Sequence, residues 1–311
     1  MSQQNRAPEP HTAVLVAAEA STALQNEFAQ FLSNETGGDI QPTHLCPHGD
    51  DFAVEAALPA VSEDQARALQ KSLEKTVGTR SDVAVLPTKG RRKKLLVSDM
   101  DSTIIEVECL DELADFAGKK AEVSAITERA MAGELNFEAA LTERVAMLAG
   151  LPLSQLQACF DQRITLTPGA DALISTSSAA EVRTVLVSGG FTFFTGRVAD
   201  RLGFDDHRGN TLIDDGAALT GDVSLPILGR EAKLTALNEE AGALDISLED
   251  TITLGDGAND LAMIKASGLG IAFRAKPIVA AEARCAINHT SLRTALYFQG
   301  YTGEDIAAAT G

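Results

Sequence analysis

Hydrophobic and polar positions divide the chain into two regions with different periodicities. The first region, residues 1–88, contains short apolar runs at 13–17, 43–45, 52–57 and 83–86. Between them lie two segments whose apolar residues recur at helical spacing, residues 21–32 and 63–77. The order strand–helix–strand–strand–helix–strand predicts a ferredoxin-like α+β module over this region.

The second region, residues 89–311, alternates apolar runs with amphipathic segments. The runs that read as strands are residues 95–97, 182–187, 251–254, 269–273 and 285–288. Strands that alternate with helices predict an α/β fold with a doubly wound parallel sheet. Residues 106–165 interrupt this alternation with helical periodicity alone. We therefore expect a helical insert after the first strand of the sheet.

Two connecting segments carry predictions of their own. The basic run at residues 89–94 coincides with the boundary between the regions, and we interpret it as a solvated linker because the rest of the chain is acidic. Residues 210–213 and 218–220 flank Asp214, Asp215 and Gly216, a turn signal that predicts a β-hairpin.

The apolar run 95–97 ends in two carboxylates, Asp99 and Asp101. Continued as a strand, this run projects both side chains to the same side, because side chains alternate with period two. The carboxyl ends of parallel strands are where open α/β sheets place their ligands. A solvated acidic turn is the alternative interpretation of such a pair.

Three further segments end in polar residues in similar contexts. Ser188 and Gly189 follow an apolar run, and Asp256, Asn259 and Asp260 follow another. Lys233 lies between them on a predicted helix, residues 230–241. Taken singly, the lysine could be a solvated charge and residues 255–257 a plain hairpin turn. The agreement of four segments in order and context favours a shared site.

In this order the four segments resemble the motifs of the haloacid dehalogenase-like phosphohydrolases, over residues 93–311. The form Asp-x-Asp-Ser-Thr at Asp99–Thr103 is similar to that of the phosphoserine phosphatases in this family. The resemblance implies a haloacid dehalogenase-like sheet, with residues 106–165 as a helical cap. It implies hydrolysis of O-phospho-L-serine to L-serine and phosphate, the last step of serine biosynthesis. Two alternatives stay open: a phosphatase or phosphotransferase for another small phosphomonoester, and an inactive amino-acid sensor.

The resemblance also implies roles for the acidic residues. Asp99 matches the nucleophile, which forms an aspartyl-phosphate, and Asp101 matches the general acid and base. The side chains of Asp99 and Asp256 and the carbonyl of Asp101 match ligands of Mg²⁺, the implied cofactor. Asp260 would lie just outside these ligands.

Substrate contacts follow from the same resemblance. Ser188, Gly189, Lys233 and Asn259 match positions around the phosphate. In the cap, Glu108 matches the acidic residue that faces the substrate ammonium, and Arg144 matches the arginine that binds its carboxylate. Met131 and Phe137 match apolar pocket residues. For each cap residue, a surface charge or an ordinary core position is the alternative.

The N-terminal module is similar to the ACT-like modules that precede some bacterial phosphoserine phosphatases. The turn after its first strand, residues 17–20, lacks the glycine with which many such domains approach an amino-acid effector. We therefore predict a structural or dimerising role for this module rather than strong serine sensing. Association into a homodimer stays an open alternative.

The net charge of −18, from 26 basic and 44 acidic residues, argues against nucleic-acid binding, which needs a cationic surface. Any phosphate site must be locally positive. Cys46, Cys109, Cys159 and Cys285 show no metal-binding spacing, which predicts reduced thiols. The chain shows no apolar signal core and no run of 18 apolar residues, so we expect a cytoplasmic protein without a membrane segment.

Overall fold

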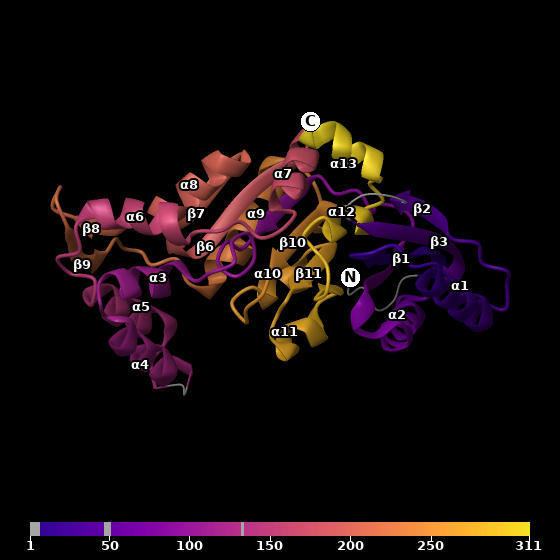
Figure 1. Ribbon diagram of the computed structural model, residues 1–311, viewed down its shortest axis with the longest axis horizontal. Helices are drawn as coiled ribbons and strands as arrows, with labels where there is room; N and C mark the ends of the chain where they lie inside the picture. The colour runs from indigo at the N-terminus through magenta and orange to yellow at the C-terminus, as the bar shows by residue number, and fades with distance from the viewer. Residues whose placement is uncertain (1–6, 47–50, 132–133) are drawn as a thin grey trace.

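The computed structural model describes residues 7–46, 51–131 and 134–311, with the side chain of Met131 left out. Figure 1 shows three parts along the long axis of the molecule: an N-terminal module at one end, a helical cap at the other, and a central sheet between them. No helix within the described residues is both long and apolar enough to cross a membrane. All four cysteines are buried, and none forms a disulfide.

The N-terminal module has the predicted ferredoxin-like order. Its elements are β1 (Glu9–Ala17), α1 (Thr22–Thr36), β2 (Thr43–Cys46), β3 (Phe52–Val61), α2 (Glu63–Val77) and β4 (Asp82–Pro87). The strands form an antiparallel sheet in the order β2-β3-β1-β4. Helix α2 begins where the sequence predicts, because Ser62 and Gln65 form a reciprocal capping box that satisfies its free amide groups.

The central sheet is parallel, as predicted, with the order β12-β11-β10-β5-β6-β7. Its strands are β5 (Leu95–Ser98), β6 (Arg183–Phe191), β7 (Asp206–Asn210), β10 (Thr251–Gly255), β11 (Leu269–Phe273) and β12 (Cys285–Ile287). Its helices are α7 (Ala170–Ala179), α8 (Thr192–Leu202), α9 (Arg230–Ala243), α10 (Leu261–Ala266), α11 (Pro277–Glu282), α12 (Thr294–Phe298) and α13 (Gly303–Thr310). Alternate residues of β5 enter two different hydrophobic clusters, because helices cover both faces of the sheet.

The cap consists of α3 (Cys109–Phe116), α4 (Lys120–Met131), α5 (Phe137–Ala146) and α6 (Leu153–Arg163), all between β5 and β6. The hairpin of β8 (Leu212–Asp214) and β9 (Leu219–Val223) lies against it. Leu219 exchanges backbone hydrogen bonds with Gly150 and Leu151 of the cap. At Gly221, a Cβ would come within 2.9 Å of Ala149, so only glycine allows this close packing.

One strand boundary in the core was predicted wrongly, and one helix was not predicted. The predicted hairpin is present as β8 and β9, but residues 210–213 are not one strand, because Asn210 ends β7 of the central sheet and Leu212 begins β8. At this boundary Asn210 Nδ2 donates to the carbonyls of Gly189 and Leu228, and Asn210 Oδ1 accepts from the Leu228 amide. Helix α7 was not predicted, and its small, alcohol-rich sequence explains why periodicity did not reveal it.

The basic segment 89–94 is not simply a solvated linker, and Arg91 is the reason. Its side chain is 9% exposed and lies between the module and the central domain. It pairs with Glu55 of β3 at 2.7 Å and donates to the carbonyls of Tyr297 and Phe298 at 3.1 and 3.0 Å. The second face of the module's sheet packs in the same hydrophobic cluster as α12. These contacts support the predicted structural role of the module, and the division at residue 88 stays a prediction.

Arg91→Ala should lower the free energy of unfolding by about 2–3 kcal/mol, because it leaves the Phe298 carbonyl and the half-buried Glu55 carboxylate without their donor. The Tyr297 carbonyl keeps a bond from the Gly300 amide. Arg92→Ala is the matched control, since Arg92 is 55% exposed and pairs with Asp305 at the surface. We expect it to cost less than about 1 kcal/mol. Urea denaturation of both variants measures the difference, and equal losses would contradict a specific role for Arg91.

Candidate active site

Two neighbouring strands bring the acidic motifs together. β5 and β10 are paired in parallel so that Ser98 lies opposite Leu254, and the amide of Asp99 donates to the Leu254 carbonyl at 3.0 Å. Asp99 and Asp256 therefore follow adjacent strand ends at the same edge of the sheet. Carboxylate oxygens of Asp99, Asp256 and Asp260 all lie within 4.8 Å of one another. The motifs that follow β5 and β10 therefore meet at one edge of the sheet, as the sequence predicts.

Lys233, on helix α9, contacts this acidic cluster. Its Nζ lies 2.7 Å from Asp99 Oδ1 and also contacts Asp260, and its side chain is 3% exposed. Although burial alone would lower it, the pKa of Lys233 is raised by Asp99 and Asp260. Lys233 is therefore a fixed positive charge, not a solvated surface lysine.

One lysine does not neutralise three carboxylates. Burial, followed by the charge of Asp260, raises the pKa of both Asp99 and Asp256, with Lys233 opposing the rise in each case. Three clustered carboxylates are hard oxygen donors, and they carry two more negative charges than Lys233 supplies. This donor set fits a divalent cation such as Mg²⁺.

Asp260 is more central than the sequence predicted. It is fully buried, accepts from the Gly257 amide at 2.9 Å and pairs with Lys233. Gly255 makes this possible, because a Cβ there would collide with the Asp260 side chain. Asn259, on the same turn, is half-buried with its Oδ1 close to Gly257. Gly255 and Gly257, on either side of Asp256, were the signal in the sequence that could have revealed this close packing.

Asp101 faces a different set of partners. Its Oδ1 accepts from the Cys109 amide and its Oδ2 from the Ser188 hydroxyl, both at 2.8 Å. Strand alternation is not what places it, because β5 ends at Ser98 and residues 101–104 form a turn in which Ser102 has a φ of 56°. The predicted reason for its position, the alternation of side chains along a strand, was therefore wrong. The turn after β5 places Asp101 instead.

Ser188 links Asp101 to the second motif. Its hydroxyl donates to Asp101 and accepts from the Gly190 amide at 2.8 Å. A Cβ on Gly190 would lie 3.0 Å from Asp101 Oδ2. The absence of a side chain at Gly190 therefore leaves room for the bond between Ser188 and Asp101. The backbone of Gly189 is held by Asn210 Nδ2, which donates to its carbonyl at 2.8 Å. Gly190 and Asn210 were not predicted as part of the site.

The cap contributes Glu108 and Arg144, the two charged residues predicted to contact the substrate. Glu108 Oε1 accepts from the Ser102 hydroxyl at 2.6 Å. Arg144 of α5 donates from Nε to the Ala140 carbonyl at 3.2 Å, and its charge interacts with those of Asp111 and Glu108. Burial lowers the pKa of Arg144 against the pull of these carboxylates. Both predicted cap charges therefore lie in one acidic neighbourhood near Asp101.

Phe137 connects the cap to the phosphate-side motifs. A Cβ on Gly189 would lie 3.1 Å from its ring, and a Cβ on Gly229 would lie 3.6 Å away. Phe137 is 39% exposed, so it borders open space while its ring lies beside the two glycines. Met131 ends α4, and its side chain lies outside the described residues.

Glu108 should make the protein's stability depend on pH. Burial, followed by repulsion from Asp101, raises its pKa from 4.5 to about 7, although the side chain keeps solvent contact. Because the folded state disfavours the ionised form, stability falls as the pH rises from about 4.5 to 7. In chelator-treated protein at pH 8, Glu108→Gln should raise Tm by about 2 °C, and at pH 4.5 it should have no effect. Glu106→Gln is the control, and a Tm gain independent of pH would contradict this cause.

Comparison with known proteins places the chain in a family. The model of the haloacid dehalogenase-like hydrolases matches residues 96–265, which hold all four motifs. The chain belongs to this family. It is 46% identical over 204 residues to a phosphoserine phosphatase from Polaromonas sp., covering 64% of this chain and 86% of that protein. A phosphoserine phosphatase from Streptomyces coelicolor is 37% identical over 292 residues, covering 94% of this chain and 70% of that one.

A solved structure shares the whole arrangement. The haloacid dehalogenase-family hydrolase from Salmonella enterica serovar Typhi superposes with a TM-score of 0.81 and is 30% identical in sequence. The match covers 93% of this chain and 98% of that one. The N-terminal module is therefore part of a fold that this family member also has.

Proposed function

We propose that this protein is a phosphoserine phosphatase, which hydrolyses O-phospho-L-serine to L-serine and phosphate. The observation that carries the proposal is the position of Glu108 and Arg144, one charge of each sign, beside the site of Asp99, Asp101 and Lys233. A substrate with an ammonium, a carboxylate and a phosphate matches these charges. Similarity to the phosphoserine phosphatases from Polaromonas sp. and Streptomyces coelicolor, among others, supports the same substrate.

Asp99 is the nucleophile in the proposed reaction. Its carboxylate attacks phosphorus, the bond from phosphorus to the serine oxygen breaks, and an aspartyl-phosphate forms. Asp101 protonates the leaving serine oxygen and then takes a proton from the water that cleaves the intermediate. The bonds that hold Asp101 to Cys109 and Ser188 fix its carboxyl group for this transfer.

The phosphate oxygens need positive charge and hydrogen-bond donors. Lys233, held between Asp99 and Asp260, supplies the charge. The Gly189 amide and the Asn259 side chain supply donors. The Ser188 hydroxyl, which donates to Asp101 in the free site, supplies another by turning its proton to the phosphate when substrate is bound. Asp260 acts through Lys233, which it positions, and does not touch the substrate itself.

A Mg²⁺ ion would be held by the side chains of Asp99 and Asp256 and by the carbonyl of Asp101, with Asp260 adjacent. When bound, it would offset the negative charge that the carboxylates and the phosphate bring together. The excess of acidic over basic groups in the cluster supports this assignment.

The cap residues select the substrate. Glu108 pairs with the ammonium and Arg144 with the carboxylate, while Phe137 forms the apolar wall beside Gly189. Ionisation of Glu108 is required for its ion pair, and its pKa of about 7 places this change in the neutral range. Closure of the cap excludes water, which strengthens both ion pairs.

The test is turnover of O-phosphoserine against a panel of small phosphomonoesters, each with Mg²⁺ and with a chelator. We expect phosphoserine to be the preferred substrate and the chelator to remove its turnover, with recovery on adding Mg²⁺. Preference for another ester would identify a related phosphatase. Binding of serine without turnover of any ester would identify an inactive sensor.

A further inference from the structure

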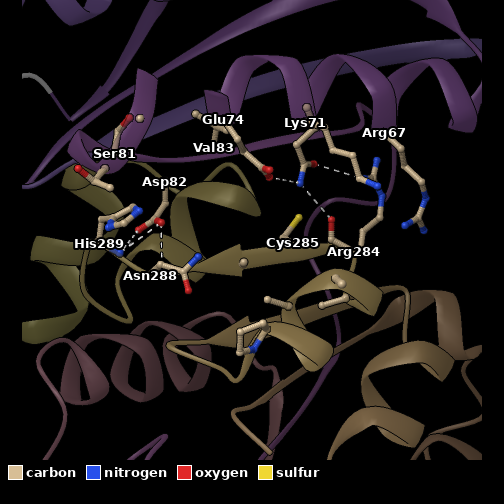
Figure 2. Close-up of a pocket in the computed structure, with 18 residues that line it drawn as sticks. Arg67, Lys71, Glu74, Ser81, Asp82, Val83, Arg284, Cys285, Asn288 and His289 are labelled. Carbon is tan, nitrogen blue, oxygen red and sulfur yellow. Dashed lines mark hydrogen bonds between the residues drawn. The ribbon is translucent and has the colours of Figure 1, made fainter. Parts of the chain in front are cut away.

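The cavity between the N-terminal module and the central domain, drawn in Figure 2, has a volume of about 640 Å³. The charged side chains around it offset one another, Arg67, Lys71 and Arg284 against Glu74, Asp82 and Glu63. The cavity therefore favours neither an anion nor a cation. A buried side chain that bears directly on the proposed phosphatase site lies elsewhere: Asn210, the last residue of β7, is 2% exposed.

The second motif interrupts the pairing of its own strand. In the ladder between β6 and β7, Val187 lies opposite Arg208, and the next pair is Phe191 with Asn210. Residues 188–190 of β6 therefore bulge, and no strand residue within the described part of the chain pairs with them. Backbone amides and carbonyls in such a bulge need partners from outside the ladder.

Asn210 supplies one of these partners. Its Nδ2 donates to the Gly189 carbonyl at 2.8 Å, and this carbonyl belongs to the same peptide unit as the Gly190 amide. The Gly190 amide donates in turn to Ser188 Oγ at 2.8 Å. Because a peptide unit is planar, fixing its carbonyl also fixes the direction of its N–H. Asn210 therefore sets the position at which the Gly190 amide meets Ser188.

This bond determines what the Ser188 hydroxyl can do. The oxygen already accepts from Gly190, so its single proton is available for donation into the site, and in the free protein it goes to Asp101. The Gly189 amide, the other donor that the second motif is proposed to supply, lies one peptide unit before the one that Asn210 holds. Both donors therefore depend on the backbone geometry that Asn210 maintains.

Asn210 also holds the segment that leads into α9. Its Oδ1 accepts from the Leu228 amide at 2.7 Å, and its Nδ2 donates to the Leu228 carbonyl at 3.3 Å. Helix α9 begins two residues later and carries Lys233. One buried amide side chain therefore joins the second motif to the start of the helix that bears the proposed phosphate-binding lysine.

We propose that Asn210 is a positioning residue of the phosphate site, which holds the peptide between Gly189 and Gly190 so that the Ser188 hydroxyl and the Gly189 amide face the phosphoryl oxygens. This role rests on the proposed phosphatase function, and Asn210 acts through its neighbours without touching the substrate. Loss of a donor that contacts the reacting group directly costs about 10²–10³ in kcat. Displacing such donors through Asn210 should cost less.

Two variants remove the Asn210 donor: Asn210→Ala, and Asn210→Leu, which keeps the volume of the side chain. In calorimetry on the full chain with Mg²⁺, both should raise the dissociation constant of orthovanadate, a phosphate analogue, by about tenfold or more. In both, kcat should fall by about 10–10² on phosphoserine and on p-nitrophenyl phosphate alike, because the two esters share the phosphoryl group. Thr211→Ala is the matched control and should keep wild-type values, since Thr211 is exposed and its hydroxyl pairs with that of Thr192.

Measurements well below the Tm of each variant keep almost all of the protein folded, so loss of stability cannot imitate weaker vanadate binding. Asn210→Ser replaces either variant if it does not fold. Wild-type vanadate affinity in Asn210→Leu would mean that the side chain only fills space, which would overturn the proposal. A loss of turnover confined to phosphoserine would overturn it too, because the defect would then lie at the cap. If the wild-type protein bound no vanadate and hydrolysed no ester, the proposed function itself would be wrong, and this role of Asn210 with it.

Discussion

Replacing Asp99 with Asn should abolish phosphoserine turnover and leave the protein folded. An amide cannot form the acyl-phosphate bond, so no covalent intermediate can arise. The fold should survive because Asp99 is a buried carboxylate whose raised pKa shows that its ionised form is disfavoured. Lys233 also keeps its ion pair with the buried Asp260. Phosphate release and thermal unfolding measure the two expectations.

Asp101→Asn is the matched comparison at the same turn. It removes the proton donor but keeps the nucleophile, so the rate should fall by about 10²–10⁴ rather than to zero. The amide oxygen can still accept from the Cys109 amide, and the amide nitrogen can donate to the Ser188 oxygen in place of Oδ2, which should preserve the local structure. More than trace activity in Asp99→Asn would rule out a covalent mechanism through this residue. Mass spectrometry of the quenched wild-type enzyme should detect the phosphorylated aspartate.

Replacing Arg144 with Ala should lower kcat/KM for phosphoserine by about 10²–10³. Leaving the substrate carboxylate desolvated and unpaired costs roughly 2–5 kcal/mol. The bond from Nε to Ala140 anchors the guanidinium to its own helix, which leaves its terminal nitrogens for the substrate. Arg144→Lys should recover only part of the activity, because an ammonium lacks the two-pronged geometry.

Substrate choice separates this role from a structural one. Hydrolysis of p-nitrophenyl phosphate, which has no carboxylate, should change far less in Arg144→Ala than hydrolysis of phosphoserine. Arg129→Ala is the control within the cap, since Arg129 is 46% exposed and pairs with Glu134 and Glu143 at the surface. Equal losses on both substrates would mean that Arg144 serves the fold or the phosphate site. The assignment to phosphoserine would then lose its main support.

The sequence by itself determined most of the order of elements, without α7, and which acidic motifs meet at one edge of the sheet. Helix α2 could be located from its capping residues, and β5 and β10 from apolar runs that end in carboxylates. These features depend on local chemistry, because caps and strand periodicity act over a few residues. The convergence of Asp99 and Asp256 was predictable too, since parallel strands end at the same edge.

Only the tertiary structure decided which partner each buried polar group has. Asp260 pairs with Lys233, 27 residues away, and Arg91 joins Glu55 to the carbonyls of α12 across the module boundary. In the sequence, Arg91 looks like any residue of a basic linker. The burial of a charged group depends on what packs over it, and that contact lies far along the chain. Local periodicity carries no information about such contacts, so the partners of Asp260 and Arg91 became visible only in the fold.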